Sequence, residues 1–211
     1  MRKIDLKKEY RQLYRPSARE VSVVDVPELQ FAMLDGRIEA GQSPGESAAF
    51  QEAVGALYAI SYALKFMSKK REVDPVDYGI MALEGLWWVD SGDFDFNRQE
   101  AWNYTLMILQ PEHITAEMWH DALAEQMRKK PNPRLAELRL ERFREGLSLQ
   151  IMHAGPYADE PRTLAQMQAF AAANGYAYRG KHHEIYLGDP RRAAPEKLQT
   201  ILRQPVEKVA G

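Results

Sequence analysis

The stretch EGLSLQIMHAGPYADEPRTLAQMQAFAAANG, residues 145–175, decides the fold because it joins two elements of different kinds. Its first part, up to Tyr157, predicts a β-strand that ends in a turn. Its second part predicts a helix, with Pro161 near its first turn and Gly175 just past its end. The second half of the chain therefore begins with a strand, a turn and a helix.

The first half of the chain shows the same order. Residues 21–41 are rich in β-branched side chains and close on Gly36, which predicts a strand followed by a turn. Ser43, Pro44 and Glu46 then fit the N-cap, first and third positions of a capping box. We therefore expect the long helix of the first half to begin at Pro44.

A hairpin is predicted after each helix. In the first half its strands are residues 78–90 and 101–111, and residues 91–100 form a polar link with turn-forming residues. In the second half, residues 181–192 and 198–208 supply the corresponding strands. Each half of the chain is thus predicted to be one βαββ unit.

Short fragments match between the two halves in the same order as these elements, such as MLDG at Met33 and MHAG at Met152. The predicted fold class is α+β, with duplicated βαββ units that form antiparallel sheets with helices on one face and a cleft at a pseudo-twofold axis. We expect a single domain over the whole chain, with a first repeat at about 21–111, a connecting helix at about 115–130 and a second repeat at about 139–209.

Composition narrows the class of protein. The 211 residues are 45% hydrophobic and carry a net charge of −2, so they allow one substantial core and show no basic footprint for nucleic acid. There are no cysteines and no apolar run long enough to span a membrane. The charged N-terminus places Leu6, Tyr10, Leu13 and Tyr14 at helical spacing, which predicts a short amphipathic helix. We expect a cytoplasmic protein without nucleic-acid or membrane partners, either a monomer or a weak homodimer.

The stretch KHHEIYLGDPRR, residues 181–192, contains the most informative polar residue. In an extended strand, His182, Glu184 and Tyr186 share one face, and His183 lies on the opposite face with Ile185. Two interpretations of Glu184 are open, a solvated strand face and a carboxylate that contacts a ligand. No spacing of histidines and carboxylates in the sequence matches a metal motif, and no cofactor is predicted.

Trp87 and Trp88 hold the corresponding place in the first hairpin. Adjacent strand residues point to opposite faces, so one tryptophan is expected in a core and the other at a cleft wall or surface. The sequence does not decide which one points inward, because a slip of one residue in register exchanges the faces. Glu84, just before this pair, is an alternative to Glu184 as the carboxylate of the cleft.

Four stretches are informative in combination: FQEAVGALYAISYALKF, LEGLWWVD, WNYTLMILQPEHIT and HHEIYLGDPRR. Together they resemble the GyrI-like small-molecule-binding family, which is related to the SOUL haem-binding proteins and to ligand domains of multidrug-sensing regulators. The resemblance extends from about Val21 to Val209. It implies an aromatic cleft between duplicated βαββ units, with a glutamate on a strand of the second repeat that meets cationic or polar ligand groups. Glu184 is the matching position.

The resemblance also implies a function. Some stand-alone members of the family hydrolyse the strained cyclopropane of DNA-alkylating natural products, so we expect binding of hydrophobic or cationic aromatic small molecules, with hydrolysis of such electrophiles for detoxification. The alternatives are a non-catalytic binding or sequestering protein, or an inhibitor of a partner such as gyrase. The proposed catalytic residues are Glu184, Tyr157 and Tyr186. The predicted ligand-binding residues are Trp87, Trp88, Tyr58, Tyr62, Tyr104, Met33 and Glu84. Core packing would also explain one of the two tryptophans, each tyrosine and Met33.

In the predicted mechanism, aromatic walls raise the pKa of Glu184 and make it a better general base for the attacking water. A tyrosine hydroxyl stabilises the negative charge that develops on the substrate oxygen. Tyr186 shares the strand face of Glu184, but it is two residues further along, so Tyr157 or Tyr104 is the alternative donor.

Overall fold

The computed structural model describes residues 1–90, 101–130, 132–189 and 192–209. The chain forms two compact units. The first unit consists of the following segments: Met1–Glu9, Leu29–Leu83 and Trp87–Phe143. The second unit consists of the following segments: Tyr10–Glu28, Glu84–Leu86 and Arg144–Gly211.

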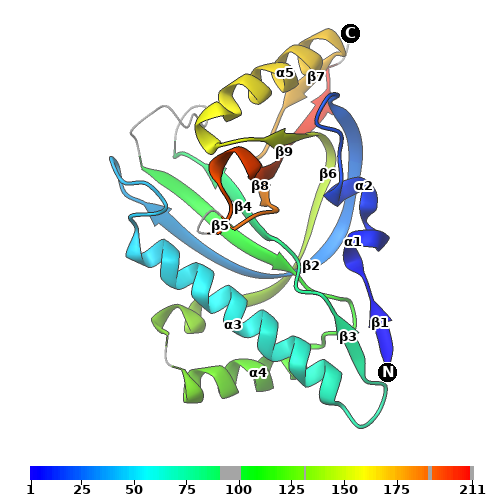
Figure 1. Ribbon diagram of the computed structural model, residues 1–211, viewed down its shortest axis with the longest axis vertical. Helices are drawn as coiled ribbons and strands as arrows, with labels where there is room; N and C mark the ends of the chain where they lie inside the picture. Colours follow the sequence, from blue (N-terminus) through cyan, green and yellow to red (C-terminus); the bar gives the residue numbers. More distant parts are fainter. Residues whose placement is uncertain (91–100, 131, 190–191, 210–211) are drawn as a thin grey trace. The chain divides into compact units, whose positions relative to one another are not determined.

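The main helix of the first unit is α3 (Ala48–Lys70), and α4 (Ala116–Lys129) packs beside it, as Figure 1 shows. Strand β2 (Ser22–Ile38) contributes its second part to this unit and pairs antiparallel with β5 (Trp102–Leu109). The apolar side chains that pack in this unit include the fully buried residues Leu34, Leu57, Ile60, Leu64, Leu106 and Ile108.

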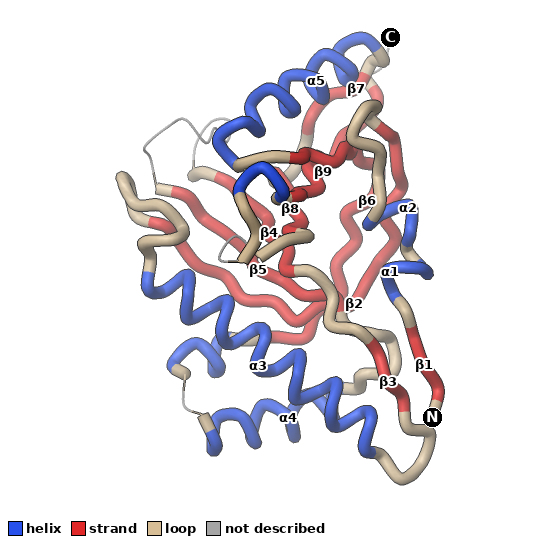
Figure 2. The backbone as a smooth tube through the Cα atoms, in the orientation of Figure 1, coloured by secondary structure: helices blue, strands red, loops and turns tan. Residues whose placement is uncertain are grey.

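Short elements complete the first unit. They are β1 (Arg2–Ile4), α1 (Leu6–Glu9), β3 (Val76–Tyr78) and the 3₁₀ helix η1 (Pro133–Glu137). Strands β1 and β3 pair in parallel, and Figure 2 shows them as a separate short pair of strands. Strand β4 (Leu83–Trp88) contributes its tryptophans to this unit and its middle residues to the other.

The second unit is built around β9 (Gln199–Lys208), which pairs antiparallel with three strands. These partners are β6 (Arg139–Ala154), β7 (Tyr176–Tyr178) and β8 (His182–Tyr186). Helix α5 (Glu160–Ala173) buries Met167 and Ala171 against a core that also contains Leu149, Ile151, Leu202 and Val206. The remaining elements are α2 (Arg11–Tyr14), η2 (Tyr157–Asp159) and η3 (Pro195–Lys197).

The structure confirms the α+β class and the repeated order of strand, helix and hairpin strands. It adds three short strands that the sequence patterns did not predict: β1, β3 and β7. The predicted link of the first hairpin, residues 91–100, lies outside the described residues. The cleft at a pseudo-twofold axis and the domain boundaries stay predictions.

Two local predictions need correction. The long helix begins at Ala48, not at Pro44, because Ser47 is the N-cap and its hydroxyl accepts the Phe50 backbone N–H at 3.3 Å. Glu46 does bond back to the Ser43 backbone N–H at 2.9 Å, but in a turn that precedes the helix. The N-terminal stretch forms two separate one-turn helices, α1 and α2, instead of one amphipathic helix.

Candidate functional site

Strand β8 is buried on both of its faces. His182, His183, Glu184 and Ile185 are all less than 8% exposed, so the solvated-face interpretation of Glu184 is wrong. A buried carboxylate is costly to keep unless protein groups hydrogen-bond to it. The partners of Glu184 and of His183 therefore define two different sites in the second unit, one on each face of the strand.

On the first face, Glu184 is held by groups of its own strand. The Tyr186 hydroxyl donates to Glu184 Oε2 at 2.6 Å, and His182 Nε2 lies 3.5 Å from Glu184 Oε1. The ring of Tyr157, from η2, meets the ring of Tyr186 edge-on, with centroids 6.1 Å apart. The structure thus brings together all three residues that the sequence suggested for catalysis.

A second carboxyl group, Glu160, joins this face. It is the first residue of α5 and is only 2% exposed, and its carboxyl group lies close to that of Glu184. Burial, followed by the charge of Glu184, raises the pKa of Glu160 well above its ordinary value. Thr200 on β9 lies beside Glu160 and lowers its pKa slightly. We define the Glu184 cluster as Glu184, Glu160, Tyr186, Tyr157, His182 and Thr200.

Tyr157 differs from the other members because it is 38% exposed. Partial burial, followed by the nearby Glu184 and Glu160 charges, raises its pKa to about 12. The hydroxyl therefore keeps its proton at neutral pH and is able to donate a hydrogen bond.

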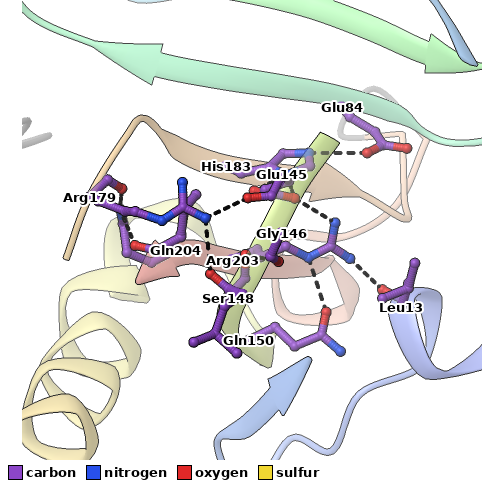
Figure 3. A network of polar contacts seen from close by, with 12 residues as sticks. Leu13, Glu84, Glu145, Gly146, Ser148, Gln150, Arg179, His183, Arg203 and Gln204 are labelled. Atoms are coloured by element: carbon purple, nitrogen blue, oxygen red, sulfur yellow. Dashed lines mark hydrogen bonds and ion pairs between the residues drawn. The ribbon is translucent and has the colours of Figure 1, made fainter. Parts of the chain in front are cut away.

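On the opposite face, His183 lies at the centre of a buried charged network (Figure 3). Its Nδ1 is 3.0 Å from Glu145 Oε1, and its Nε2 is 3.0 Å from Glu84 Oε2. Arg203 Nη1 donates to Glu145 Oε2 at 3.2 Å, and the Tyr14 hydroxyl donates to Glu84 Oε1 at 2.6 Å. Both oxygens of Glu84 are therefore taken by protein donors.

The other two guanidinium nitrogens of Arg203 also have partners. Arg203 Nη2 donates to the Leu13 carbonyl at 2.8 Å, and Nε donates to Gln150 Oε1 at 3.1 Å. Figure 3 shows the guanidinium between these acceptors and Glu145. Two carboxylates, one guanidinium and one imidazole are thus packed together with little access to water.

These contacts shift the proton affinities of the network. Burial would raise the pKa of Glu145, but the charges of His183 and Arg203 outweigh burial and lower it to about 2. Burial would lower the pKa of His183, but the charge and hydrogen bond of Glu145, with the hydrogen bond to Glu84, raise it overall. His183 is therefore stabilised as an imidazolium between two carboxylates.

The first unit contains an aromatic cluster. The ring of Trp87 stacks on Phe50 at 5.9 Å between centroids and lies 5.8 Å from Tyr104, which also meets Phe50 edge-on at 5.2 Å. Trp102 completes the cluster, 6.3 Å from Trp87. The Tyr104 hydroxyl is buried and has no hydrogen-bond partner among the described residues. Trp87 is the tryptophan that points into a core.

The other predicted ligand-binding residues of the first unit have different surroundings. Trp88 and Tyr58 are half-buried. Tyr62 is 48% exposed and stacks on Phe66 one helical turn later, and Met33 is buried opposite Met107 in the β2–β5 pair. Ligand binding by these residues stays a prediction.

Sequence reasoning missed Glu160, because an acidic residue in the first turn of a helix is ordinary. It also missed Glu145, Arg203 and Tyr14, which come from three separate segments of the chain. Glu145 and Arg203 are single charged residues within strands, and Tyr14 belongs to a segment that was expected only to pack on the rest of the protein. Nothing in these local sequences distinguishes a buried ion pair from a solvated charge.

The described residues contain no group of three or more His, Cys, Asp or Glu side chains arranged to hold a metal ion. Within the same residues, no helix is both long enough and apolar enough to cross a membrane.

The architecture identifies a class, α+β proteins in which the order of strand, helix and hairpin is repeated. Residues 19–207 match the sequence profile of the GyrI-like small molecule binding domain. The chain belongs to this family. No curated protein sequence matches the chain.

Solved structures agree with this assignment. An uncharacterized conserved protein from Listeria innocua is 40% identical, with a TM-score of 0.87 over 97% of this chain and 100% of that one. A hydrolase from the same organism is 38% identical, with a TM-score of 0.84 over 98% of this chain and 100% of that one. The C-terminal domain of EcmrR shares the fold alone, at 11% identity and a TM-score of 0.54 over 90% of this chain and 98% of that one.

Proposed function

We propose that this protein binds hydrophobic or cationic aromatic small molecules at the Glu184 cluster and hydrolyses strained electrophiles, such as the cyclopropane of DNA-alkylating natural products. The observation that carries the proposal is a carboxylate that is 3% exposed, with one oxygen held by a tyrosine hydroxyl 2.6 Å away. Membership of a small-molecule-binding family and 38% identity to a Listeria hydrolase support it.

The chemistry needs a base and a hydrogen-bond donor. In a cyclopropane conjugated to a dienone, water attacks a ring carbon, a ring C–C bond breaks, and its electrons move to the distant carbonyl oxygen, which becomes a phenolate. Glu184 accepts the proton that the attacking water loses, and that proton later neutralises the phenolate. A hydroxyl donor beside the oxygen stabilises the charge where it develops.

The contacts suggest different roles for the two tyrosines. The hydroxyl proton of Tyr186 is engaged by Glu184, so Tyr186 is a positioning residue that fixes the carboxylate. Tyr157 keeps its proton at neutral pH and packs against Tyr186, and we assign it the hydrogen bond to the developing phenolate.

Incubation with a cyclopropane-bearing alkylator, followed by mass analysis of the product, tests the proposal directly. The addition of one water molecule per substrate over many turnovers is the expected result. Recovery of the unchanged compound in a stoichiometric complex would instead show a sequestering protein.

Replacing Glu184 by Gln tests the general base. A general base contributes about 10²–10⁴-fold to the rate, so Glu184→Gln should reduce turnover by about 100-fold or more. Binding of an uncharged ligand should change little. The measurement is steady-state hydrolysis beside ligand titration, with Glu196→Gln, an exposed glutamate of the same unit, as the control. Turnover equal to that of the parent protein would exclude Glu184 as the base.

A further inference from the structure

Two carboxyl groups in one buried cluster raise the question of how many charges the cluster carries. Glu160 and Glu184 are 2% and 3% exposed, and Glu184 lies close enough to Glu160 for its charge and side chain to raise the pKa of Glu160. Two carboxylates that lie close together in a buried site do not both ionise readily, because each charge opposes the other in a medium of low polarity. One proton shared between them removes this repulsion.

Counting hydrogen-bond donors leads to the same conclusion. Glu184 Oε2 receives the Tyr186 hydroxyl, but Glu184 Oε1 and Glu160 Oε1 are buried and receive no hydrogen bond from any described residue. A buried carboxylate oxygen without a donor is costly. A proton on one carboxyl group supplies a donor to the other.

The position of Glu160 at the N-terminus of α5 opposes its protonation, since the helix dipole favours a negative charge there. The cost of burying a second charge beside Glu184 outweighs this effect, so the neutral form of Glu160 prevails. Glu184 is the ionised member because it accepts a hydrogen bond from the Tyr186 hydroxyl and lies beside His182.

We propose that Glu160 is a protonated carboxylic acid that donates a hydrogen bond to the Glu184 carboxylate, and that the pair presents one negative charge to a monocationic aromatic ligand. The ligand part of this inference rests on the proposed binding function, whereas the proton-sharing pair does not. The pair makes Glu160 a positioning residue, because it acts on a ligand or on water through Glu184.

Other titratable groups face the pair from each neighbouring element. They are His182 and Tyr186 on β8, Tyr157 on η2, and Asp189 in the loop after β8, whose charge acts on Tyr157. Asp189 is itself paired with Arg192 at 3.8 Å. The neighbour from β9 is the uncharged Thr200. A proton shared between the two carboxyls compensates their repulsion directly.

The pair predicts an unusual result for Glu184→Gln. In Glu184→Gln, the charge and side chain of Glu184 no longer raise the pKa of Glu160 and only burial still does, so we expect Glu160 to ionise more readily and to restore the single negative charge. Glu160→Gln, in contrast, keeps an N–H donor for Glu184 in place of the acid proton. Each single variant therefore keeps one charge, and only the double variant loses it.

The experiment measures binding of rhodamine 6G, an aromatic monocation, by tryptophan quenching at about pH 7, where an unperturbed glutamate is ionised. Each single variant should bind within about threefold of the parent, and the double variant should bind at least tenfold more weakly, a difference of about 1.4 kcal/mol or more. Nile red, an uncharged aromatic dye, is the matched control and should bind all four proteins alike. An equal loss in Glu184→Gln and in the double variant would overturn the pair.

Carbon-13 NMR of the glutamate carboxyl carbons tests the pair without any ligand. The Glu160 signal is assigned by its absence in Glu160→Gln. In the parent protein its chemical shift should remain that of a neutral acid through neutral pH. In Glu184→Gln the same signal should titrate at a lower pH. A Glu160 signal that titrates with the exposed glutamates in the parent protein would refute the proposal. If no dye binds the parent protein, the proposed binding function fails and this titration still decides the pair.

Discussion

At the scale of single residues, the Tyr186 hydroxyl is the contact that fixes Glu184. Removing it in Tyr186→Phe leaves a buried carboxylate oxygen without its 2.6 Å donor. A hydrogen bond to a charged group is worth about 1.5–3 kcal/mol, so the free energy of unfolding should fall by about that amount. Denaturant unfolding measures it.

The matched control is Tyr62→Phe, since Tyr62 is 48% exposed on α3 and its substitution should change stability by less than about 0.5 kcal/mol. If the two variants were equally stable, the Tyr186 hydrogen bond would contribute nothing to the fold. A loss of turnover in Tyr186→Phe beyond the loss of folded protein would show that the hydroxyl also orients the base.

The residue scale also shows where sequence reasoning succeeds. Strand periodicity placed Glu184 and Tyr186 on one face, and their hydrogen bond confirms it. The same pattern did not reveal that both faces are buried, because His182 and His183 resemble residues of a solvated strand. The buried partner of His183, Glu145, lies on another strand and is distant in sequence.

At the scale of elements, the β2–β5 pair depends on a glycine. Gly36 lies opposite Tyr104, and a Cβ atom at Gly36 would be 2.2 Å from Cζ of the tyrosine ring. Gly36→Ala therefore forces apart a well-packed region and should destabilise the protein by about 1–3 kcal/mol, a typical cost of overpacking. Thermal or denaturant unfolding measures the effect.

Gly79→Ala is the control within the same unit, because nothing lies within 4 Å of the added Cβ there. Tyr104→Leu removes the ring that the added Cβ would meet. Gly36→Ala should therefore cost less stability in the Tyr104→Leu background than in the parent protein. Equal effects of the Gly36 and Gly79 substitutions would show that the pairing adjusts without cost.

Local sequence signals predicted which helices form better than they predicted the residues at which the helices begin. The N-cap at Thr115, whose hydroxyl accepts the Met118 backbone N–H at 3.2 Å, follows directly from the residue type and the helix that succeeds it. At the long helix, Ser43 and Ser47 both fit an N-cap, and the capping-box partner Glu46 favoured the wrong one. The Ser47 hydroxyl accepts the Phe50 backbone N–H as an N-cap does, whereas the Ser43 hydroxyl donates to the Glu46 carboxylate in a turn before the helix.

At the scale of the whole molecule, the sequence predicted the class and the repeated order because both follow from local periodicity and turns. It did not predict the charged network, because that network depends on which distant strands pair. Glu84, Glu145, His183 and Arg203 come from four different strands, and Glu145 and Arg203 look like ordinary surface charges in their own segments.

This network should make the stability of the molecule depend on pH in two directions. The pKa of Glu145 is lowered to about 2 in the folded state, so its contribution is present above its unfolded pKa and is lost as the pH falls through about 2. A shift of this size is worth roughly 3 kcal/mol. The pKa of His183 is raised, so its contribution is present below its unfolded pKa and is lost as the pH rises through the folded pKa.

Urea unfolding across the pH range should therefore show maximal stability between these limits, with a decline on the alkaline side that depends on His183. His183→Gln keeps hydrogen-bonding capacity but does not titrate, so it should be less stable near neutral pH and should lack that alkaline decline. His120→Gln, an exposed histidine on α4, should keep the parent profile. Parallel profiles for the parent and His183→Gln would mean that His183 is uncharged within the network, because only a bound proton links its contacts to pH.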